Sequence, residues 1–376
     1  MEDIYFFKFP LEDSLAGAEF HTLKLAKHFK SQGHRVSLVS SDKKLIGLFQ
    51  ANGLDNKYLF AGWEPTAKWS LLFWPLTYII AKIKFRRILK TTSAGSVFFM
   101  QSLTEKLILS PMLSTPSSSP PYQGGGRVGV WLEHKVPGRW LSKNPLLGEY
   151  LKLAKQVRMV TVSNYAKNEF MKLGVLENKI NVIYPGIAIH SSSQPSFALR
   201  KGDGLRIGIL SRLDPEKGVL NFLRLIAPRL PNHPNWRILV GGSGKDENKI
   251  KKIAATNSQI KLLGFVNDPD DFFPQISVLC YPSQTPESFG VAVMEAMGRG
   301  IPVIAARLGA LSEIIQHEKT GFSVNPARQD EWLESLEKIE NPEIYQKLSR
   351  DARLAAENFS NEKMFSAFDN LIFQNR

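Results

Sequence analysis

The chain has 376 residues, 43% of them hydrophobic, which is enough for two domains of ordinary size with a core each. A single cysteine, Cys280, excludes an internal disulfide, and no segment reaches the roughly 18 uninterrupted apolar residues of a membrane span. The formal net charge of +13 lies almost entirely in the first half: residues 1–190 hold 25 Lys and Arg against 13 Asp and Glu, whereas residues 191–376 hold 23 against 22.

Strands and helices are predicted to alternate along the first half of the chain. A strand over 4–9 precedes a helix over 17–31, whose apolar residues recur at helical spacing and which Gly33 ends. The N-terminal segment lacks the basic and apolar regions of a signal peptide. Alternation of this kind predicts a parallel, doubly wound sheet. Further strands are predicted over 36–39, 96–100, 128–132, 159–162 and 180–184.

The segment from Pro65 to Thr104 contains no acidic residue, although it is rich in lysine, arginine and aromatic residues. Such a segment meets an anionic partner or is a solvated basic face over an ordinary helix. The partner could be nucleic acid or an anionic membrane leaflet, and the aromatic residues favour the membrane. The apolar run 71–83 is predicted to be an amphipathic or core helix. The basic residues are Lys68, Lys82, Lys84, Arg86, Arg87 and Lys90, and the aromatic residues are Trp63, Trp69, Phe73, Trp74 and Tyr78.

Two low-complexity stretches divide the chain. Residues 114–126 are predicted to form a disordered surface insertion, with a Pro-rich docking site as the alternative, and residues 191–196 to form an interdomain linker. The predicted domains are therefore 1–190 and 191–355, followed by a C-terminal helix, 356–376, that packs back on the first domain. Strands of the second half are predicted over 206–210, 237–240, 261–263, 278–281 and 302–305, and a helical run over 345–372.

Two glutamates, Glu287 and Glu295, lie eight positions apart across a predicted loop-to-helix junction. The loop follows the strand 278–281, and open α/β sheets bind ligands beyond the carboxyl ends of their strands. A helix start offers free N–H groups and a positive dipole end, and Gly290 lets a ligand approach the backbone. The segment can therefore hold an anion while its carboxylates bind hydroxyls on either side, which is the layout of a nucleotide sugar.

Arg212 and Lys217 follow the predicted strand 206–210. Two fixed cations on such a loop could bind a diphosphate and stabilise its departure without a metal. Alternatively, they belong to a solvated turn in which Asp214 and Glu216 pair with them. The presence of the Glu287 segment in the same half of the chain favours diphosphate binding as the role of these two residues.

Two further motifs are weaker. The glycine-rich stretch 241–246 departs from the dinucleotide fingerprint at Glu247 and from the phosphate loop at Asp246, although its turn would still admit a ligand near the backbone. Asp268 and Asp270 have the spacing of a metal-binding pair, but an Asp before a helical run is routinely an N-cap.

Two residues of the first half are candidates as well. His134 follows the strand 128–132, where it could hydrogen-bond a sugar hydroxyl or the reaction centre, or be purely structural. Gly17 opens the helix 17–31, where its N–H could bind a phosphate or its small size could admit an acceptor. The alternative is a plain helix start, with Glu19 in the first turn favoured by the dipole.

Together, these motifs resemble those of the retaining nucleotide-sugar glycosyltransferases of family 4, over almost the whole chain except 114–126. Glu287 and Glu295 match the two-glutamate motif of the family. Residues 211–218 match its Gly-Arg…Lys-Gly element with Ser211 in place of glycine, and residues 16–19 match its Gly-Gly-x-Glu loop with one glycine lost. The resemblance implies an α/β protein of GT-B fold: two facing Rossmann-like, doubly wound domains with a cleft between them.

The resemblance also implies a role for each residue. The first domain would bind the acceptor, with His134 on that side, and the second domain would bind the donor. The residues implied in catalysis are Glu287, His134, Arg212 and Lys217. Those implied in donor binding are Gly17, Arg212 and Lys217 (diphosphate side), Glu287 (sugar hydroxyls), Phe289, Gly290 and Val291 (backbone near sugar and phosphate), Glu295 (ribose), and Gly264, Phe265 and Val266 (base).

The implied activity is transfer of a hexose, with retained anomeric configuration, to a glycan or lipid-linked acceptor in cell-surface polysaccharide or glycolipid synthesis. A front-face mechanism is the usual proposal, so Glu287 is not cast as a covalent nucleophile. Neither a cofactor nor a divalent metal is expected, and no nucleic acid partner. The expected location is the cytoplasm, peripheral to an anionic membrane surface at the inner face of the plasma membrane.

One departure from the family lies at 184–188, where Tyr-Pro-Gly-Ile-Ala stands in place of Pro-Asn-Gly-Val-Asp. An alternative from another class is a non-catalytic GT-B-like protein that binds nucleotide or nucleic acid through its basic first half. The presence of both cations and both glutamates speaks against that alternative. A nicotinamide-dependent enzyme is disfavoured because Glu247 replaces the third glycine.

Overall fold

The computed structural model describes residues 1–11, 15, 17–113, 126–189 and 202–373. The chain divides into two compact units: the first joins Met1–Tyr184 to Met364–Arg376, and the second is Pro185–Lys363. The predicted linker 191–196 and the predicted insertion, apart from Gly126, lie outside the described residues. Within the described parts, no helix is both long enough and apolar enough to cross a membrane.

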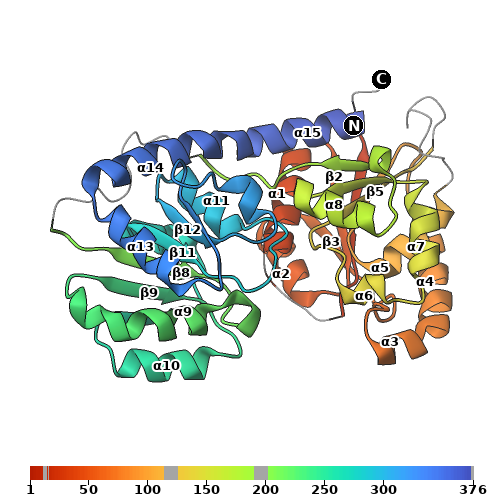
Figure 1. Ribbon diagram of the computed structural model, residues 1–376. Coiled ribbons are helices and arrows are strands. Elements are labelled where there is room, and N and C mark those ends of the chain that lie inside the picture. Colours follow the sequence, from red (N-terminus) through yellow and green to blue (C-terminus); the bar gives the residue numbers. More distant parts are fainter. Residues whose placement is uncertain (12–14, 16, 114–125, 190–201, 374–376) are drawn as a thin grey trace. The chain divides into compact units, whose positions relative to one another are not determined.

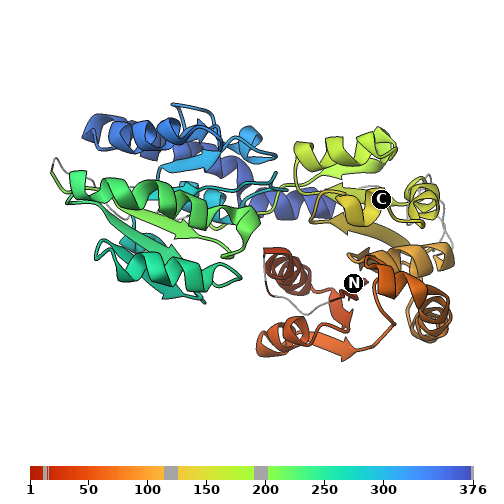
Figure 2. The same cartoon turned by 60° about the horizontal axis from the view of Figure 1, so that its bottom comes forward.

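The described part of the first unit is built on a parallel sheet with the strand order β3-β2-β1-β4-β5-β6-β7. This order is doubly wound, as predicted, and Figure 2 shows β3 at one edge beside α2. The strands are β1 (Asp3–Lys8), β2 (Arg35–Ser40), β3 (Asp55–Tyr58), β4 (Val97–Met100), β5 (Val128–Glu133), β6 (Arg158–Thr161) and β7 (Ile180–Val182).

Both faces of this sheet are covered by helices. Successive strand residues point to opposite faces, so Phe6 packs in one core with α1 and α2, while Phe7 packs in the other with α4, α5 and α7. This explains why the central strands read as continuous apolar runs. The helices are α1 (Gly17–Ser31), α2 (Lys43–Ala51), α3 (Lys68–Leu72), α4 (Trp74–Leu89), α5 (Leu103–Leu109), α6 (Arg139–Ser142), α7 (Leu147–Ala154) and α8 (Asn164–Lys172).

The C-terminal helix α15 (Asn361–Phe373) contributes to the core of the first unit. Its residues Met364, Phe368 and Ile372 recur every four positions and are almost fully buried in that core. The helical run predicted over 345–372 is wrong as a continuous element, because α14 (Pro342–Ala356) ends before a 3₁₀ turn (Glu357–Phe359) and α15 begins after it.

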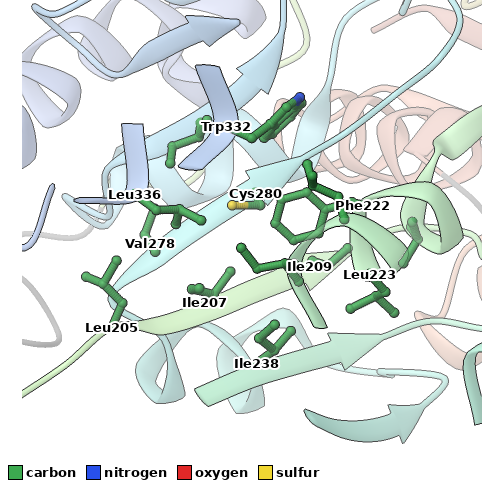
Figure 3. Close-up of a cluster of buried hydrophobic side chains, with 14 of the residues drawn as sticks. Leu205, Ile207, Ile209, Phe222, Leu223, Ile238, Val278, Cys280, Trp332 and Leu336 are labelled. Atoms are coloured by element: carbon green, nitrogen blue, oxygen red, sulfur yellow. The ribbon is translucent and has the colours of Figure 1, made fainter. Parts of the chain in front are cut away.

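The described part of the second unit contains another parallel sheet, with the order β10-β9-β8-β11-β12-β13. Figure 3 shows its core, in which the Cys280 thiol of β11 lies among side chains of α9 and α13. The strands are β8 (Arg206–Leu210), β9 (Arg237–Gly241), β10 (Ile260–Gly264), β11 (Val278–Tyr281), β12 (Val303–Ala306) and β13 (Phe322–Val324). The helices are α9 (Val219–Ile226), α10 (Glu247–Ala255), α11 (Val291–Gly298), α12 (Leu311–Ile314), α13 (Gln329–Ile339) and α14 (Figure 1).

Each sheet has a switch point, where the strand order reverses and a crevice opens beyond the carboxyl ends of the strands. In the first unit this point lies between β1 and β4, and in the second between β8 and β11. The loops after β8 and β11 carry Lys217 and Glu287. The topology therefore brings together two segments that are about 70 residues apart in the sequence.

Candidate active site

Lys217 and Glu287 form a direct ion pair at the switch point of the second unit. The Lys217 Nζ donates to both carboxylate oxygens of Glu287, at 2.7 and 2.9 Å. The Ser283 hydroxyl donates to Glu287 Oε1 at 2.7 Å. Both charged side chains are largely buried, with 16% of Lys217 and 12% of Glu287 exposed. Three hydrogen bonds from two donors, one on each loop, thus converge on one carboxylate that still reaches the surface.

Tyr281, the last residue of β11, lies beside the same carboxylate. Burial, followed by the negative charge of Glu287, holds the pKa of the Tyr281 phenol well above its ordinary value. The Lys217 ammonium lies 6.0 Å from the centroid of the Tyr281 ring. The phenol therefore stays protonated and the ring forms an aromatic wall for the ion pair.

The loop that carries Lys217 is held tightly against the loop after β11. The backbone N–H of Gln284 donates to the Glu216 carbonyl at 2.8 Å, and the Ser283 hydroxyl oxygen lies 3.3 Å from the same carbonyl oxygen. Gly218 has φ 67°, and a Cβ there would collide with the Pro282 carbonyl oxygen. Glycine is therefore required at the position that ends the Pro215–Lys217 turn and starts α9.

The glycine-rich turn after β9 supports this loop from the other side. A Cβ on Gly242 would collide with the Ser211 carbonyl oxygen, and one on Gly244 would lie 2.6 Å from the Leu213 carbonyl carbon. The Leu213 N–H donates to the Ser243 carbonyl at 2.8 Å. Among the described residues, what approaches these glycines is the neighbouring loop, so their role in this structure is to fix the loop that carries Arg212 and Lys217.

Arg212 is placed differently from Lys217. Its guanidinium forms ion pairs with Asp214 and, at 3.0 Å, with Glu216, and 58% of its side chain is exposed. This is the arrangement of the alternative solvated turn. Lys217, in contrast, pairs across to Glu287 rather than with the acids of its own loop.

The second glutamate lies on α11, one turn and a half beyond the loop. Gly290 has φ 105° and is the N-cap of α11, so Val291 is the first helical residue and Glu295 lies half-buried in the second turn. Phe289 is buried and packs against Phe359, with ring centroids 6.0 Å apart. The first turn of α11 directs its N–H groups toward the loop that holds Glu287.

The segment expected beside the base begins where β10 ends. Gly264 has φ 75° and its carbonyl accepts a hydrogen bond from Gly242 N–H at 2.7 Å. The Val266 side chain packs against Gly241: a Cβ built on Gly241 would lie 2.8 Å from it. Phe265 is 61% exposed, so an aromatic face is open to solvent at this end of the sheet.

Asp268 caps a 3₁₀ turn, as its alternative interpretation predicted. Its side chain accepts the Asp270 N–H at 2.9 Å, and the Asp270 carboxylate forms an ion pair with Arg299. In the described part of the chain, no group of three or more His, Cys, Asp or Glu side chains is arranged to hold a metal ion.

In the first unit, His134 follows β5 and contacts a second histidine. The Nε2 atom of His134 lies 2.8 Å from Nδ1 of His21, a residue of α1. Burial lowers the pKa of His21 to about 3, and burial followed by the charge of His21 lowers the pKa of His134 well below its ordinary value. Both rings are therefore neutral near pH 7, and one donates the shared hydrogen bond to the other. The Nε2 atom of His21 is buried and has no partner among the described residues.

Buried ion pairs surround these histidines at the carboxyl ends of β1 and β5. Lys8 pairs with Glu19, in the first turn of α1, and Lys106 pairs with Glu133 at 2.7 Å. Burial raises the pKa of Glu105 to about 8, although it accepts N–H groups at the start of α5. Gly17 is the exposed first residue of α1. The switch point of the first unit is thus polar and mostly internally paired.

Three residues of these sites were not predicted from the sequence. Ser283 and Tyr281 contact Glu287, and His21 contacts His134. Tyr281 and Ser283 lie at the end of a predicted strand, and this position could have marked them as candidate site residues. His21 is different, because nothing in the sequence relates it to a histidine 113 positions later.

The two sheets and their switch-point loops define a protein of the GT-B glycosyltransferase class. The family model "Glycosyltransferase Family 4" matches residues 15–190, and "Glycosyl transferases group 1" matches residues 193–357, so the two together span most of the chain. The chain belongs to glycosyltransferase family 4.

Relatives of known sequence agree with this assignment. A glycosyltransferase of Haemophilus influenzae is 25% identical over 60% of this chain and 64% of its own length. A D-inositol 3-phosphate glycosyltransferase of Acidothermus cellulolyticus is 27% identical over 55% and 51%. The matches therefore span less than two thirds of the length of either relative.

Solved structures match over the whole length. The Anabaena protein HepE in complex with UDP has a TM-score of 0.79 at 17% identity, covering 100% of both chains. HepE in complex with UDP-glucose has a TM-score of 0.76 at 18% identity, covering 99% of both. A glycosyltransferase from Rickettsia africae has a TM-score of 0.75 at 19% identity, covering 100% of this chain and 99% of its own. These similarities establish the GT-B fold.

Proposed function

We propose that this protein transfers a hexose from a nucleotide-diphosphate sugar to a glycan or lipid-linked acceptor, with retention of the anomeric configuration. The observation that carries the proposal is the Lys217–Glu287 pair, with Ser283, at the switch point of the second unit. A cation and a carboxylate in contact, beside a helix start, suit a ligand that joins phosphate to sugar hydroxyls. HepE, which shares the fold, binds UDP and UDP-glucose, so a uridine nucleotide is the first donor to test.

The residues would divide the work as follows. Lys217 would bind a diphosphate oxygen, with Arg212 joining if it exchanges its acidic partners for phosphate. Glu287 would accept hydrogen bonds from sugar hydroxyls, and Ser283 and Tyr281 would fix its position. Glu295 would bind the ribose. The backbone of Phe289 to Val291 would contact the sugar and the phosphate. Gly264 to Val266 would lie beside the base.

The reaction we propose breaks the bond between the anomeric carbon and the diphosphate oxygen and forms a bond from that carbon to an acceptor oxygen on the same face. The acceptor hydroxyl proton passes to the departing diphosphate. Lys217 stabilises the charge that develops on that diphosphate, so this chain needs no bound metal for the step. Glu287 acts on the sugar hydroxyls and forms no covalent bond.

On the acceptor side, we propose that the first unit takes the glycan or lipid-linked substrate, with Gly17 and His134 at its switch point. The acceptor would belong to cell-surface polysaccharide or glycolipid synthesis and would be met at the inner face of the plasma membrane. His21 would hold the His134 ring in one orientation through the 2.8 Å hydrogen bond. The neutral state of both rings suits hydrogen bonding to hydroxyls.

The test is an assay of glucose transfer to a membrane extract, with UDP-glucose and its guanosine and adenosine analogues as donors. Transfer is measured as release of the nucleoside diphosphate. Lys217→Ala and Glu287→Ala should lower transfer by about a hundredfold or more, because each removes a group that contacts the reacting donor. Lys252→Ala, which removes an exposed lysine of α10, is the control. Turnover close to that of the unmodified protein in either site variant would refute the site. Nuclear magnetic resonance of the product decides between retention and inversion, and turnover in EDTA tests metal independence.

A further inference from the structure

Exposed apolar side chains of this protein are concentrated in one short segment. Of the sixteen large hydrophobic residues that are exposed in the described part of the chain, ten lie between Tyr58 and Ile83. Large exposed apolar patches on soluble domains mark surfaces that another body covers. Figure 1 shows that the helices involved, α3 and α4 in orange, lie on the outside of the first unit.

Helix α4 has two apolar faces, only one of which is covered by the protein. Ala81, Phe85 and Ile88 lie on its inner face and belong to the core. Leu76, Ile79 and Ile83 lie at spacings of three and four on its other side and are 52%, 56% and 47% exposed. One face is enough to hold α4 on the unit, so the outer apolar face serves a different contact.

Aromatic side chains extend this outer face beyond α4. The Trp63 ring lies 5.6 Å from Phe73 and 5.9 Å from Trp69, centroid to centroid, and each of the three is more than a third exposed. Indole rings combine an apolar body with a polar N–H and are enriched where proteins meet the headgroup level of a bilayer.

The charges on the same helices are all positive. Lys68 opens α3, and Arg86, Arg87 and Lys90 lie at the end of α4; all four are exposed. Neither these residues nor Lys82 and Lys84 form an ion pair with any acidic residue of the described part, and no acid occurs between Pro65 and Thr104. Lys84 instead donates to the Phe60 carbonyl at 2.6 Å.

We propose that this α3–α4 surface docks on an anionic lipid bilayer. The surface consists of Trp63, Trp69, Leu72, Phe73, Leu76, Ile79 and Ile83, with Lys68, Arg86, Arg87 and Lys90. The apolar residues enter the boundary between headgroups and acyl chains, and the basic residues bind the lipid phosphates. The proposal gives the first unit a place to meet a lipid-linked acceptor, and in that respect it rests on the proposed function.

The composition of this surface disfavours two other partners, a second copy of this chain and nucleic acid. A two-fold contact between copies of this chain would place the same basic surface on both sides of the interface, and no acidic residue between Pro65 and Thr104 is available to pair with those charges. Nucleic acid would accept the basic residues but leaves the exposed leucine and isoleucine side chains of α4 without a partner.

The experiment is co-sedimentation of the full chain with vesicles of phosphatidylcholine alone or with about a third phosphatidylglycerol. We expect binding to the anionic vesicles that weakens as salt rises. Ile79→Ser with Ile83→Ser should weaken binding about tenfold, because two apolar anchors are lost. Arg86→Glu with Arg87→Glu should weaken it by about 25-fold or more, because the two lost positive charges contribute roughly fivefold each and the two added negative charges are repelled.

Matched controls separate this surface from a general effect. Leu176→Ser removes a leucine of the same unit that is 48% exposed, close to the 47% of Ile83. Lys43→Glu with Lys44→Glu reverses two exposed lysines at the start of α2 and changes the net charge equally. Both controls should bind anionic vesicles within about twofold of the unmodified protein, because neither touches the α3–α4 surface.

Three results would overturn the proposal: no vesicle binding, equal binding to neutral and anionic vesicles, or a self-association in ultracentrifugation that Ile79→Ser with Ile83→Ser abolishes. A thermal shift with UDP, measured without vesicles, should be the same in every variant of this surface. Loss of vesicle binding with that shift intact is a failure of docking alone, whereas vesicle binding without any nucleotide response is a failure of the proposed function alone.

Discussion

At the scale of single residues, the two charged side chains Lys217 and Glu287 at the switch point of the second unit form an ion pair with one another. Lys217 and Glu287 neutralise one another when no donor is bound, at distances of 2.7 and 2.9 Å. Removal of one partner leaves the other largely buried without compensation, which costs stability as well as activity. Glu287→Gln also removes the charge but keeps the shape and the hydrogen-bonding capacity of the side chain, so it disturbs the site less than truncation does.

The buried His21–His134 pair predicts a dependence of stability on pH. The pKa of His21 is lowered to about 3 in the folded protein, from an ordinary 6.5. Between these values the unfolded chain binds a proton that the folded chain does not, so the free energy of unfolding falls as the pH falls below about 6.5. We expect His21→Asn to reduce that slope by up to about 1.4 kcal/mol per pH unit.

The measurement is urea unfolding at pH 7, 6 and 5. His317→Asn, which changes a histidine of the second unit with 48% of its side chain exposed, is the control, and it should alter the slope less than His21→Asn because solvent reaches its ring in the folded protein. An equal slope in His21→Asn and in the unmodified protein would mean that His21 is protonated as easily in the folded state as in the unfolded state.

At the scale of elements, the loop between β8 and α9 depends on glycine for its position. Gly218 has φ 67°, and a Cβ would collide with the Pro282 carbonyl oxygen. Gly53 is the matched control, because its φ is 64° but nothing lies within 4 Å of a Cβ built there. We expect Gly53→Ala to cost about 1 kcal/mol of stability, from backbone strain alone.

Gly218→Ala should cost about 2 kcal/mol more than this control and should also weaken nucleotide binding, because the loop must move away from Glu287. Thermal unfolding with and without UDP measures both effects. If the two glycine variants behave alike, the contact between the two loops does not position Lys217.

The sequence predicted the elements whose pattern is local and strong. Strands β8 and β11 fall where their apolar runs place them, and α1 has the predicted bounds of 17–31. It did not predict β3, which reads Asp-Asn-Lys-Tyr at the edge of its sheet, or the three-residue β13. Such strands are formed by backbone pairing with a neighbour rather than by their own side chains, so no hydrophobic period marks them.

The candidate site shows the same limit. The sequence identified Lys217 and Glu287 separately, because each lies in a recognisable motif at the end of a predicted strand. It could not show which acids the two cations pair with. Lys217 binds Glu287 on the other loop, whereas Arg212 binds Asp214 and Glu216 of its own loop. Pairing of that kind depends on the strand order of the sheet, which a linear pattern does not contain.

At the scale of the whole molecule, the two units have unequal chemistry on a shared architecture. The first unit carries most of the positive charge, a buried polar switch point and the exposed α3–α4 surface, whereas the second is close to electrically balanced and carries the Lys217–Glu287 pair. This division fits the proposed donor site in the second unit and the proposed docking of the first unit on an anionic bilayer.

The measurement that tests the central claim most directly is the thermal shift of the protein with uridine, guanosine and adenosine diphosphates and their hexose derivatives. The preferred nucleotide should raise the melting temperature by mass action, and its sugar derivative should raise it further. Lys217→Ala should lose both responses, whereas Glu287→Gln should keep the response to the nucleotide and lose the gain from the sugar. Responses in both variants equal to those of the unmodified protein would contradict a donor site built on Lys217 and Glu287.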